Sequence, residues 1–168
     1  MPDDIRAELI EGQIVYMASP SRLHQDISHE LDFAITSYIK SKGGKCRVYT
    51  APFGVQLNDK KDTVLEPDIS VICDTDKLTP RGCVGAPDWI IEIASPSNPS
   101  HDYITKLNLY HDAHVREYWI VDDQSSQILV YNMESGSFTM KAYTFTDTVK
   151  AGIFEDLYIN FSSLDLGI

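Results

Sequence analysis

Hydrophobic residues in the first quarter of the chain follow two periods, one typical of strands and one typical of a helix. Two short apolar runs within 8–17 flank a Glu-Gly pair at 11–12, which predicts a β-hairpin. From Leu23 to Ile39 the apolar positions then recur every four residues, until a pair of glycines at 43–44. This spacing predicts a long amphipathic helix that ends at the glycines.

The rest of the chain is expected to form strands with one further helix between them. A second helix is predicted at 102–113. Pro67 is expected at a strand start, at an edge or beside a bulge, because it cannot donate to a strand ladder. Strand-like runs lie at 46–50, 53–57, 64–73, 88–94, 116–122, 127–132 and 138–145, with a last short strand within 157–164. This order predicts one α+β (α/β) domain over 1–168, with a mixed β-sheet core, two main helices and an added antiparallel C-terminal meander.

The charge balance limits the kinds of partner. A hydrophobic fraction of 43% and a charged fraction of 23% are typical of a globular domain. The formal net charge of −11 argues against a general polyanion-binding surface, because phosphate contacts draw on clustered Lys and Arg. A local basic groove or bound cations would still admit nucleic acid. The candidate basic residues are Arg22, Lys40, Lys42, Lys45, Arg47, Lys60 and Lys61.

The cysteines and the N-terminal segment are used to predict the cellular compartment of the protein. Cys46, Cys73 and Cys83 are widely spaced and odd in number, so we expect reduced thiols rather than a disulfide framework or a zinc site. No basic segment followed by an apolar segment opens the chain, and no apolar stretch is long enough to span a bilayer. A cytoplasmic protein without a membrane partner is predicted.

Two acids stand in segments that otherwise look buried. Side chains alternate between the faces of a strand, so Glu92 shares a face with Ile90 and lies opposite Ile91, while Asp68 stands in the strand-like run that contains Pro67. If these two runs pair, the acids lie on neighbouring strands about 5 Å apart. Two carboxylates at such a short distance repel each other unless one is protonated or a cation lies between them. Their oxygens suit Mg²⁺ or Mn²⁺.

The second helix brings a lysine toward these acids. Lys106 follows Asp102 at i+4, and the short connection from Glu92 places the helix back near the strand end. Two acids, a metal and a lysine form a site for phosphodiester hydrolysis. Each part also has a simpler interpretation: Asp102 and Lys106 as a solvated surface pair, and the Pro-Asp at 67–68 as a turn.

The segments EPDISVI (66–72) and GAPDWIIEIASPSNPSHDYITKLNLYHDAHVREYWIVD (85–122) resemble the Uma-type putative restriction endonuclease family of the PD-(D/E)xK nuclease superfamily. The resemblance extends from residue 8 to about 131. It implies a restriction-endonuclease-like core, with Asp68 and Glu92 as metal ligands and, with Lys106, as catalytic residues. The superfamily usually carries its lysine two residues after the glutamate, where this chain has Ala94. The resemblance implies that the lysine comes instead from the following helix.

Further residues are candidates for the edge of this site. His24 opens the first helix and fits the family pattern, although a capping or surface histidine is the simpler interpretation. Asp102 and Tyr110 lie one turn on either side of Lys106, and Tyr110 also suits a packing role. Glu8 and Glu30 are weaker candidates for outer carboxylates.

The leading functional prediction is a Mg²⁺- or Mn²⁺-dependent endodeoxyribonuclease acting on DNA. The alternative is a catalytically inactive nuclease-fold module that binds nucleic acid or a protein. Because cutting both strands of a duplex is most simply done by a two-fold dimer, a homodimer is expected, with its interface drawn from the aromatic-rich strands in 116–145.

Overall fold

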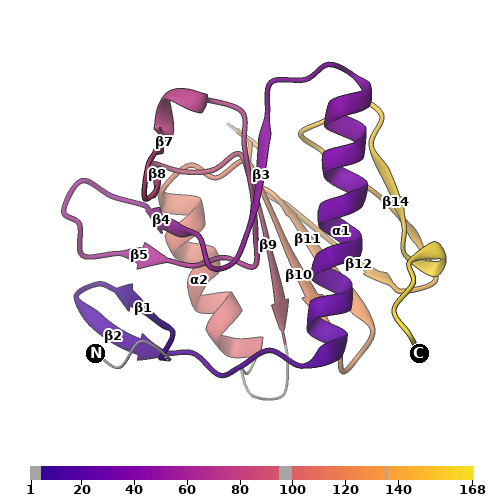
Figure 1. Cartoon of the computed structure of the whole chain (residues 1–168), viewed down its shortest axis with the longest axis horizontal. Coiled ribbons are helices and arrows are strands. Elements are labelled where there is room, and N and C mark those ends of the chain that lie inside the picture. The colour runs from indigo at the N-terminus through magenta and orange to yellow at the C-terminus, as the bar shows by residue number, and fades with distance from the viewer. Residues whose placement is uncertain (1–4, 95–99, 135) are drawn as a thin grey trace.

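A six-stranded mixed sheet forms the middle layer of the fold (Figure 1). The computed structural model describes residues 5–94, 100–134 and 136–168, and the side chains of 100–102 lie outside that description. The strands run in the order β12-β11-β10-β9-β6-β3; β9 and β10 are parallel, and all other neighbours are antiparallel. Their bounds are β3 (Arg47–Thr50), β6 (Ile69–Ile72), β9 (Trp89–Ala94), β10 (Glu117–Asp122), β11 (Gln127–Asn132) and β12 (Thr139–Thr144).

The long helix α1 (Arg22–Ser41) covers one face of this sheet. Its stripe from Ile27 to Ile39 is buried against Trp89 and Ile91 of β9, as the four-residue spacing predicts. The Ser21 side chain caps the helix by accepting a hydrogen bond from the His24 amide (3.1 Å). The C-terminal segment packs on the same face through β13 (Thr148–Lys150), β14 (Tyr158–Asn160) and the 3₁₀ turn η2 (Phe161–Ser163).

The opposite face of the central sheet is covered by α2 (Ser100–Asp112) and a second sheet. Ile90 of β9 and Tyr118 of β10 pack there against Tyr110 of α2 and Leu65. The second sheet has the order β2-β1-β5-β4-β8-β7. Its strands are β1 (Ala7–Ile10), β2 (Gln13–Tyr16), β4 (Gly54–Gln56), β5 (Val64–Leu65), β7 (Leu78–Thr79) and β8 (Gly82–Val84), and the 3₁₀ turn η1 (Thr75–Lys77) precedes β7.

The predicted α+β fold with two helices and a C-terminal meander is confirmed, and three details differ. The expected single strand at 64–73 is wrong: Pro67 lies between β5 and β6, which belong to different sheets. The segment 74–87, expected to be a loop, contains the short strands β7 and β8. The strand β13 was not expected and pairs with the predicted last strand, β14.

The prediction of three free thiols is wrong. Cys46 and Cys73 form a disulfide, and Cys83 is a free, buried thiol. The reason lies in the strand register, because Arg47 of β3 pairs with Ile72 of β6 and the two cysteines therefore follow as the next opposed positions. The cytoplasmic location rested partly on free thiols and stays a prediction. Within the described residues, no helix is both long and apolar enough to cross a membrane.

The aromatic side chains expected at a dimer interface lie mainly inside the chain. Tyr118 and Trp119 of β10 are fully buried, and Trp119 packs at 4.8 Å, centroid to centroid, on Trp89. In the same region Phe138 and Met140 are exposed. The β10 aromatics are therefore core residues, and the homodimer stays a prediction.

Candidate active site

Asp68 and Glu92 lie side by side at one end of the central sheet. β6 and β9 are antiparallel with Ile69 opposite Ile91, so the residue before β6, Asp68, comes opposite Glu92. The amide of Ile93 donates a hydrogen bond to Asp68 Oδ2 (2.7 Å), which fixes this carboxylate at the strand end. The predicted neighbouring strands therefore do pair, and they bring the two acids together.

Glu92 points to the α2 side of the sheet, where a lysine and a tyrosine meet it. Lys106 Nζ lies 3.1 Å from Glu92 Oε1, and the Tyr110 hydroxyl donates to the same oxygen at 2.7 Å. Lys106 and Tyr110 are one turn apart on α2, so both reach the strand from one helix face. The predicted lysine and the site-edge candidate Tyr110 thus both lie beside Glu92.

A third carboxylate, Glu8 of β1, completes this cluster and was only a weak candidate from the sequence. Its Oε2 lies 2.8 Å from Lys106 Nζ, and its Oε1 accepts from the Glu66 amide (3.0 Å). Glu8 is 4% exposed, Glu92 2% and Lys106 7%. The signal for Glu8 was an acid within a short apolar strand. By contrast, Glu30 accepts from the amide of Asp165 in the C-terminal segment and lies outside the cluster.

His24 approaches Asp68 from the other layer, at the start of α1. Its Nε2 lies 3.1 Å from Asp68 Oδ1. Its Nδ1 is buried and has no hydrogen-bond partner among the residues that the structure describes. His24 therefore contacts the site, while the side chain of Asp102, the remaining edge candidate, lies outside the described part of the chain.

The surroundings of Glu92 and Lys106 shift the pKa values of both groups. Burial is the main reason that the pKa of Glu92 rises to about 7; the Asp68 and Glu8 charges add to the rise, while Lys106 and the Tyr110 hydrogen bond oppose it. Burial disfavours the Lys106 ammonium, yet Glu92 and Glu8 outweigh this and raise its pKa above the ordinary value. Glu92 therefore exchanges its proton near neutral pH, while Lys106 stays charged.

Burial also disfavours the charged imidazole of His24. The hydrogen bond and charge of Asp68, with the charges of Asp123 and Glu92, outweigh this effect and raise the His24 pKa above its usual value. For Tyr110, burial and the nearby Glu92 raise the pKa well above that of a free phenol, so the hydroxyl stays a hydrogen-bond donor.

Two cavities meet at Asp68. One, of about 390 Å³, lies beneath the β1–β2 hairpin and has Glu8, Asp68, Glu92 and Lys106 in its wall. The other, of about 440 Å³, lies beside the start of α1 and is lined by polar groups that include His24. Solvent and ligand atoms therefore have room next to the carboxylates.

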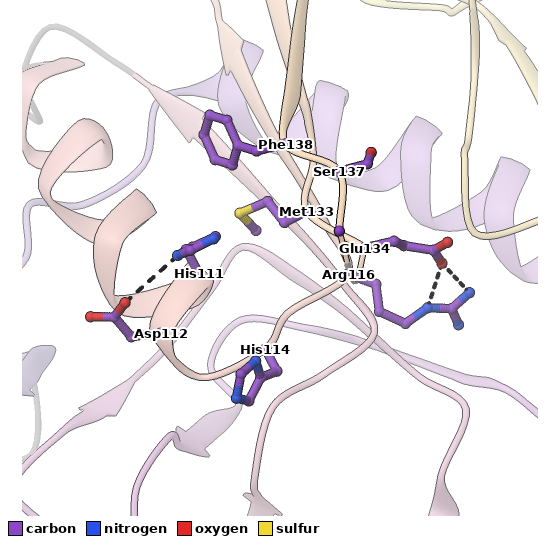
Figure 2. A pocket seen from close by; sticks show the side chains of 9 residues that line it. His111, Asp112, His114, Arg116, Met133, Glu134, Ser137 and Phe138 are labelled. Atoms are coloured by element: carbon purple, nitrogen blue, oxygen red, sulfur yellow. Dashed lines mark hydrogen bonds and ion pairs between the residues drawn. The ribbon is translucent and has the colours of Figure 1, made fainter.

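A larger hollow, of about 1200 Å³, lies elsewhere, at the end of α2 and the start of β10 (Figure 2). There Arg116 donates to Glu134, His111 pairs with Asp112 beside it, and the His111 ring meets the edge of Phe138 at 5.6 Å between centroids. The side chains of these ionic pairs are between 41% and 84% exposed, so solvent screens them. This hollow has none of the buried carboxylates that distinguish the site at Asp68.

The oxygen donors of the site suit a small divalent cation. Among the described residues, no three His, Cys, Asp or Glu side chains converge closely enough to hold a metal as they stand. Mg²⁺, however, is commonly bound by one or two carboxylates, with water and substrate phosphate as the other ligands. Asp68 and Glu92 line one cavity and offer carboxylate oxygens to it, so their chemistry fits such an ion.

Comparisons with known proteins identify the family of the chain. The family model "Uma2: Putative restriction endonuclease" matches residues 1–162. The chain belongs to this family. Among curated proteins, the uncharacterized protein slr1290 of Synechocystis sp. is similar, with 26% identity over 145 residues, 85% of this chain and 75% of that protein.

A solved structure shares the fold of this Uma2-family chain. It is described as a putative nuclease belonging to DUF820 from Anabaena variabilis, and it superimposes with a TM-score of 0.78 over 94% of this chain and 88% of that one. The sequence identity of 22% makes this a likeness of fold. The restriction-endonuclease-like architecture predicted from the sequence is thereby confirmed.

Proposed function

We propose that this Uma2-family chain hydrolyses phosphodiester bonds of DNA with the help of a divalent cation. The observation that carries the proposal is the meeting of Asp68, Glu92 and Lys106 in one cavity although they come from three separate elements. Burying three carboxylates around one lysine is unfavourable for folding, so a function accounts for the cluster better than stability does.

The residues of the chain have distinct roles in this proposal. Asp68, fixed by the Ile93 amide, and Glu92, fixed by Tyr110, would hold Mg²⁺ or Mn²⁺. When bound, the ion would supply an activated water and neutralise charge on the phosphate. Lys106 would donate to the attacking water or to a phosphate oxygen, because an ammonium in a buried site stabilises developing negative charge strongly. Glu8 keeps that ammonium charged and in place.

One observation favours the alternative, a nuclease-fold module without activity. Lys106 is bound by two acids, and the chain has a net charge of −11. A lysine that only neutralises buried acids would give the same contacts. The two functions differ in whether the site binds a cation and whether bound nucleic acid is cut.

A cleavage assay tests the proposal. Purified protein is incubated with labelled single-stranded and duplex DNA in the presence of Mg²⁺, of Mn²⁺ or of a chelator. The proposal predicts cleavage with either ion and none with the chelator, together with Mn²⁺ binding in calorimetry. Mn²⁺ binding without cleavage of any DNA would favour the inactive module. If the protein neither binds Mn²⁺ nor cleaves DNA, the cluster is structural.

A further inference from the structure

The carboxylates of the site are too deeply buried for a flat surface to meet them. Glu8, Asp68 and Glu92 are between 2% and 6% exposed, and they are reached through a cavity of about 390 Å³. A cavity of this size matches one small-molecule-sized group. A phosphodiester must therefore enter the cavity with its neighbouring nucleotide to approach the acids.

The roof of this cavity is one face of the β1–β2 hairpin. Glu8 pairs with Val15 and Ile10 with Gln13, so these four side chains share a face, and all four line the cavity. Ile10 and Val15 offer apolar surface, and Gln13 offers an amide donor and acceptor. A flat, apolar group with a hydrogen-bonding edge fits such a roof.

The floor of the cavity adds an aromatic ring. Tyr103 of α2 lines it, is 4% exposed and donates from its hydroxyl to the Ile93 carbonyl (3.3 Å). Lys106 Nζ lies 5.7 Å from the centroid of that ring, so the lysine sits between the tyrosine and the acids. The cavity thus places apolar and aromatic side chains next to charged ones, and a nucleotide likewise joins a base to a phosphate.

Positive charge around the cavities is sparse. Of the lysines and arginines in the described chain, Lys106 and Arg6 line the two cavities, and both are ion-paired, Arg6 with Glu66 (3.1 Å). Lys40 and Lys42 lie at the opposite end of α1, which spans about 30 Å (Figure 1). Arg22, at the start of α1, is exposed but is also ion-paired, with Asp26 (3.3 Å). A duplex is held mainly through phosphate contacts from many basic side chains, and this end of the molecule has few.

We infer that the cavity beneath the hairpin is a subsite for one unstacked base, and that the substrate is single-stranded or locally unpaired DNA. The inference rests on the proposed function for the cleavage step. Base stacking and apolar contact add to the phosphate contacts of a single strand, a contribution that a stacked and paired duplex does not offer. The strand then passes Asp68 into the second cavity, where His24, Ser28 and Thr50 place polar groups beside the adjoining backbone. A single strand needs one active site, so the inference requires no dimer.

Matched oligonucleotides test this substrate class. One labelled sequence is presented single-stranded, as a perfect duplex and as a duplex with an unpaired bulge, and kcat/KM is measured with Mg²⁺. The inference predicts cleavage of the single strand and the bulge at least about tenfold faster than the perfect duplex. Equal or faster cleavage of the perfect duplex would overturn it while leaving the proposed function intact.

A pair of hairpin variants separates the cavity from the rest of the surface. Val15→Ser removes apolar roof from the cavity, whereas Ile14→Ser makes a similar change at the neighbouring position, on the other face of the strand. Binding of the single strand is measured by fluorescence anisotropy in a Lys106→Ala background, with Mg²⁺ present. We expect Val15→Ser to weaken binding at least about fivefold more than Ile14→Ser.

This binding measurement also covers the case in which no DNA is cut. If the chain binds the single strand and Val15→Ser selectively weakens that binding, the base subsite stands and the nuclease proposal fails. If the two serine variants bind alike, or if the duplex binds better than the single strand, the base subsite is wrong.

Discussion

Lys106 and Glu92 form a buried ion pair with 3.1 Å between Nζ and Oε1, although one residue lies on a strand and the other on the helix that follows it. Neither side chain is more than 9% exposed. The pair explains how a chain with Ala94 two residues after Glu92 still brings a lysine to its carboxylates. The strand places the acid on the α2 face, and α2 returns along that face with Lys106 directed at it.

Replacing this lysine separates cation binding from chemistry. Lys106→Ala removes a positive charge but no metal ligand, so Mn²⁺ affinity in calorimetry is expected to stay the same or to increase. Cleavage is expected to fall by about 10²-fold or more, the loss typical of removing one group that stabilises transition-state charge. Lys42→Ala is the control, because Lys42 is also ion-paired, with Asp156, but lies on the surface at the far end of α1. Equal cleavage by Lys106→Ala and Lys42→Ala would show that Lys106 is only a counter-ion.

Glu8 is expected to act through Lys106. Glu8→Gln keeps the side-chain shape but removes one of the two charges that hold the ammonium, so cleavage should fall less than in Lys106→Ala. Because both residues serve one interaction, the double variant should lose about as much activity as Lys106→Ala alone. Glu30→Gln, outside the cluster, is the control. Fully additive losses would contradict this role for Glu8.

The raised pKa of Glu92 predicts an unusual pH dependence of stability for the metal-free protein. Folded Glu92 keeps its proton up to about pH 7, whereas the unfolded chain loses it near 4.5, so the free energy of unfolding falls as pH rises between these values. His24, whose pKa is raised, contributes stability below its ordinary pKa of 6.5 that is lost as pH rises through the raised value, in the same direction. Urea unfolding at pH 5 and at pH 8, with a chelator present to keep the protein metal-free, measures this fall in the free energy of unfolding.

Glu92→Gln isolates the Glu92 contribution to that change, since glutamine does not titrate. The variant should lose less stability than the parent between pH 5 and pH 8, by an amount on the order of 1–3 kcal/mol. Identical changes in the two proteins would mean that Glu92 has an ordinary pKa in the folded state.

The sequence predicts the parts of this site that depend on local patterns. Alternation along 88–94 places Glu92 opposite Ile91 and Ile93, and the i+4 spacing places Lys106 and Tyr110 on one helix face, as the structure has them. What it does not predict depends on long-range pairing. Glu8 joins the cluster because β1 pairs with β5 in a second sheet, and nothing local to 7–10 specifies that partner. The disulfide was missed for the same reason, since it follows from the β3–β6 register.

The Cys46–Cys73 disulfide is expected to stabilise the fold. It joins residues 27 positions apart, and closing a loop of that length stabilises a protein by roughly 2–4 kcal/mol. A reducing agent should therefore lower the urea midpoint of the parent protein. The Cys46→Ser/Cys73→Ser double variant should unfold at the lower midpoint with or without the reducing agent. It keeps the free thiol of Cys83, so it also shows whether the reducing agent acts through that residue. An unchanged midpoint on reduction of the parent would contradict this contribution.

The most direct test of the account is the Mg²⁺ dependence of single-strand cleavage by Glu92→Gln. Glutamine keeps the shape of Glu92 but removes a charged ligand, so we expect no cleavage at any Mg²⁺ concentration and weaker Mn²⁺ binding in the same protein preparation. Glu134→Gln, which removes a carboxylate from the larger hollow, should cleave like the parent. Cleavage by Glu92→Gln at the parental rate, or loss of activity in Glu134→Gln alone, would contradict a metal-dependent nuclease centred on Asp68 and Glu92.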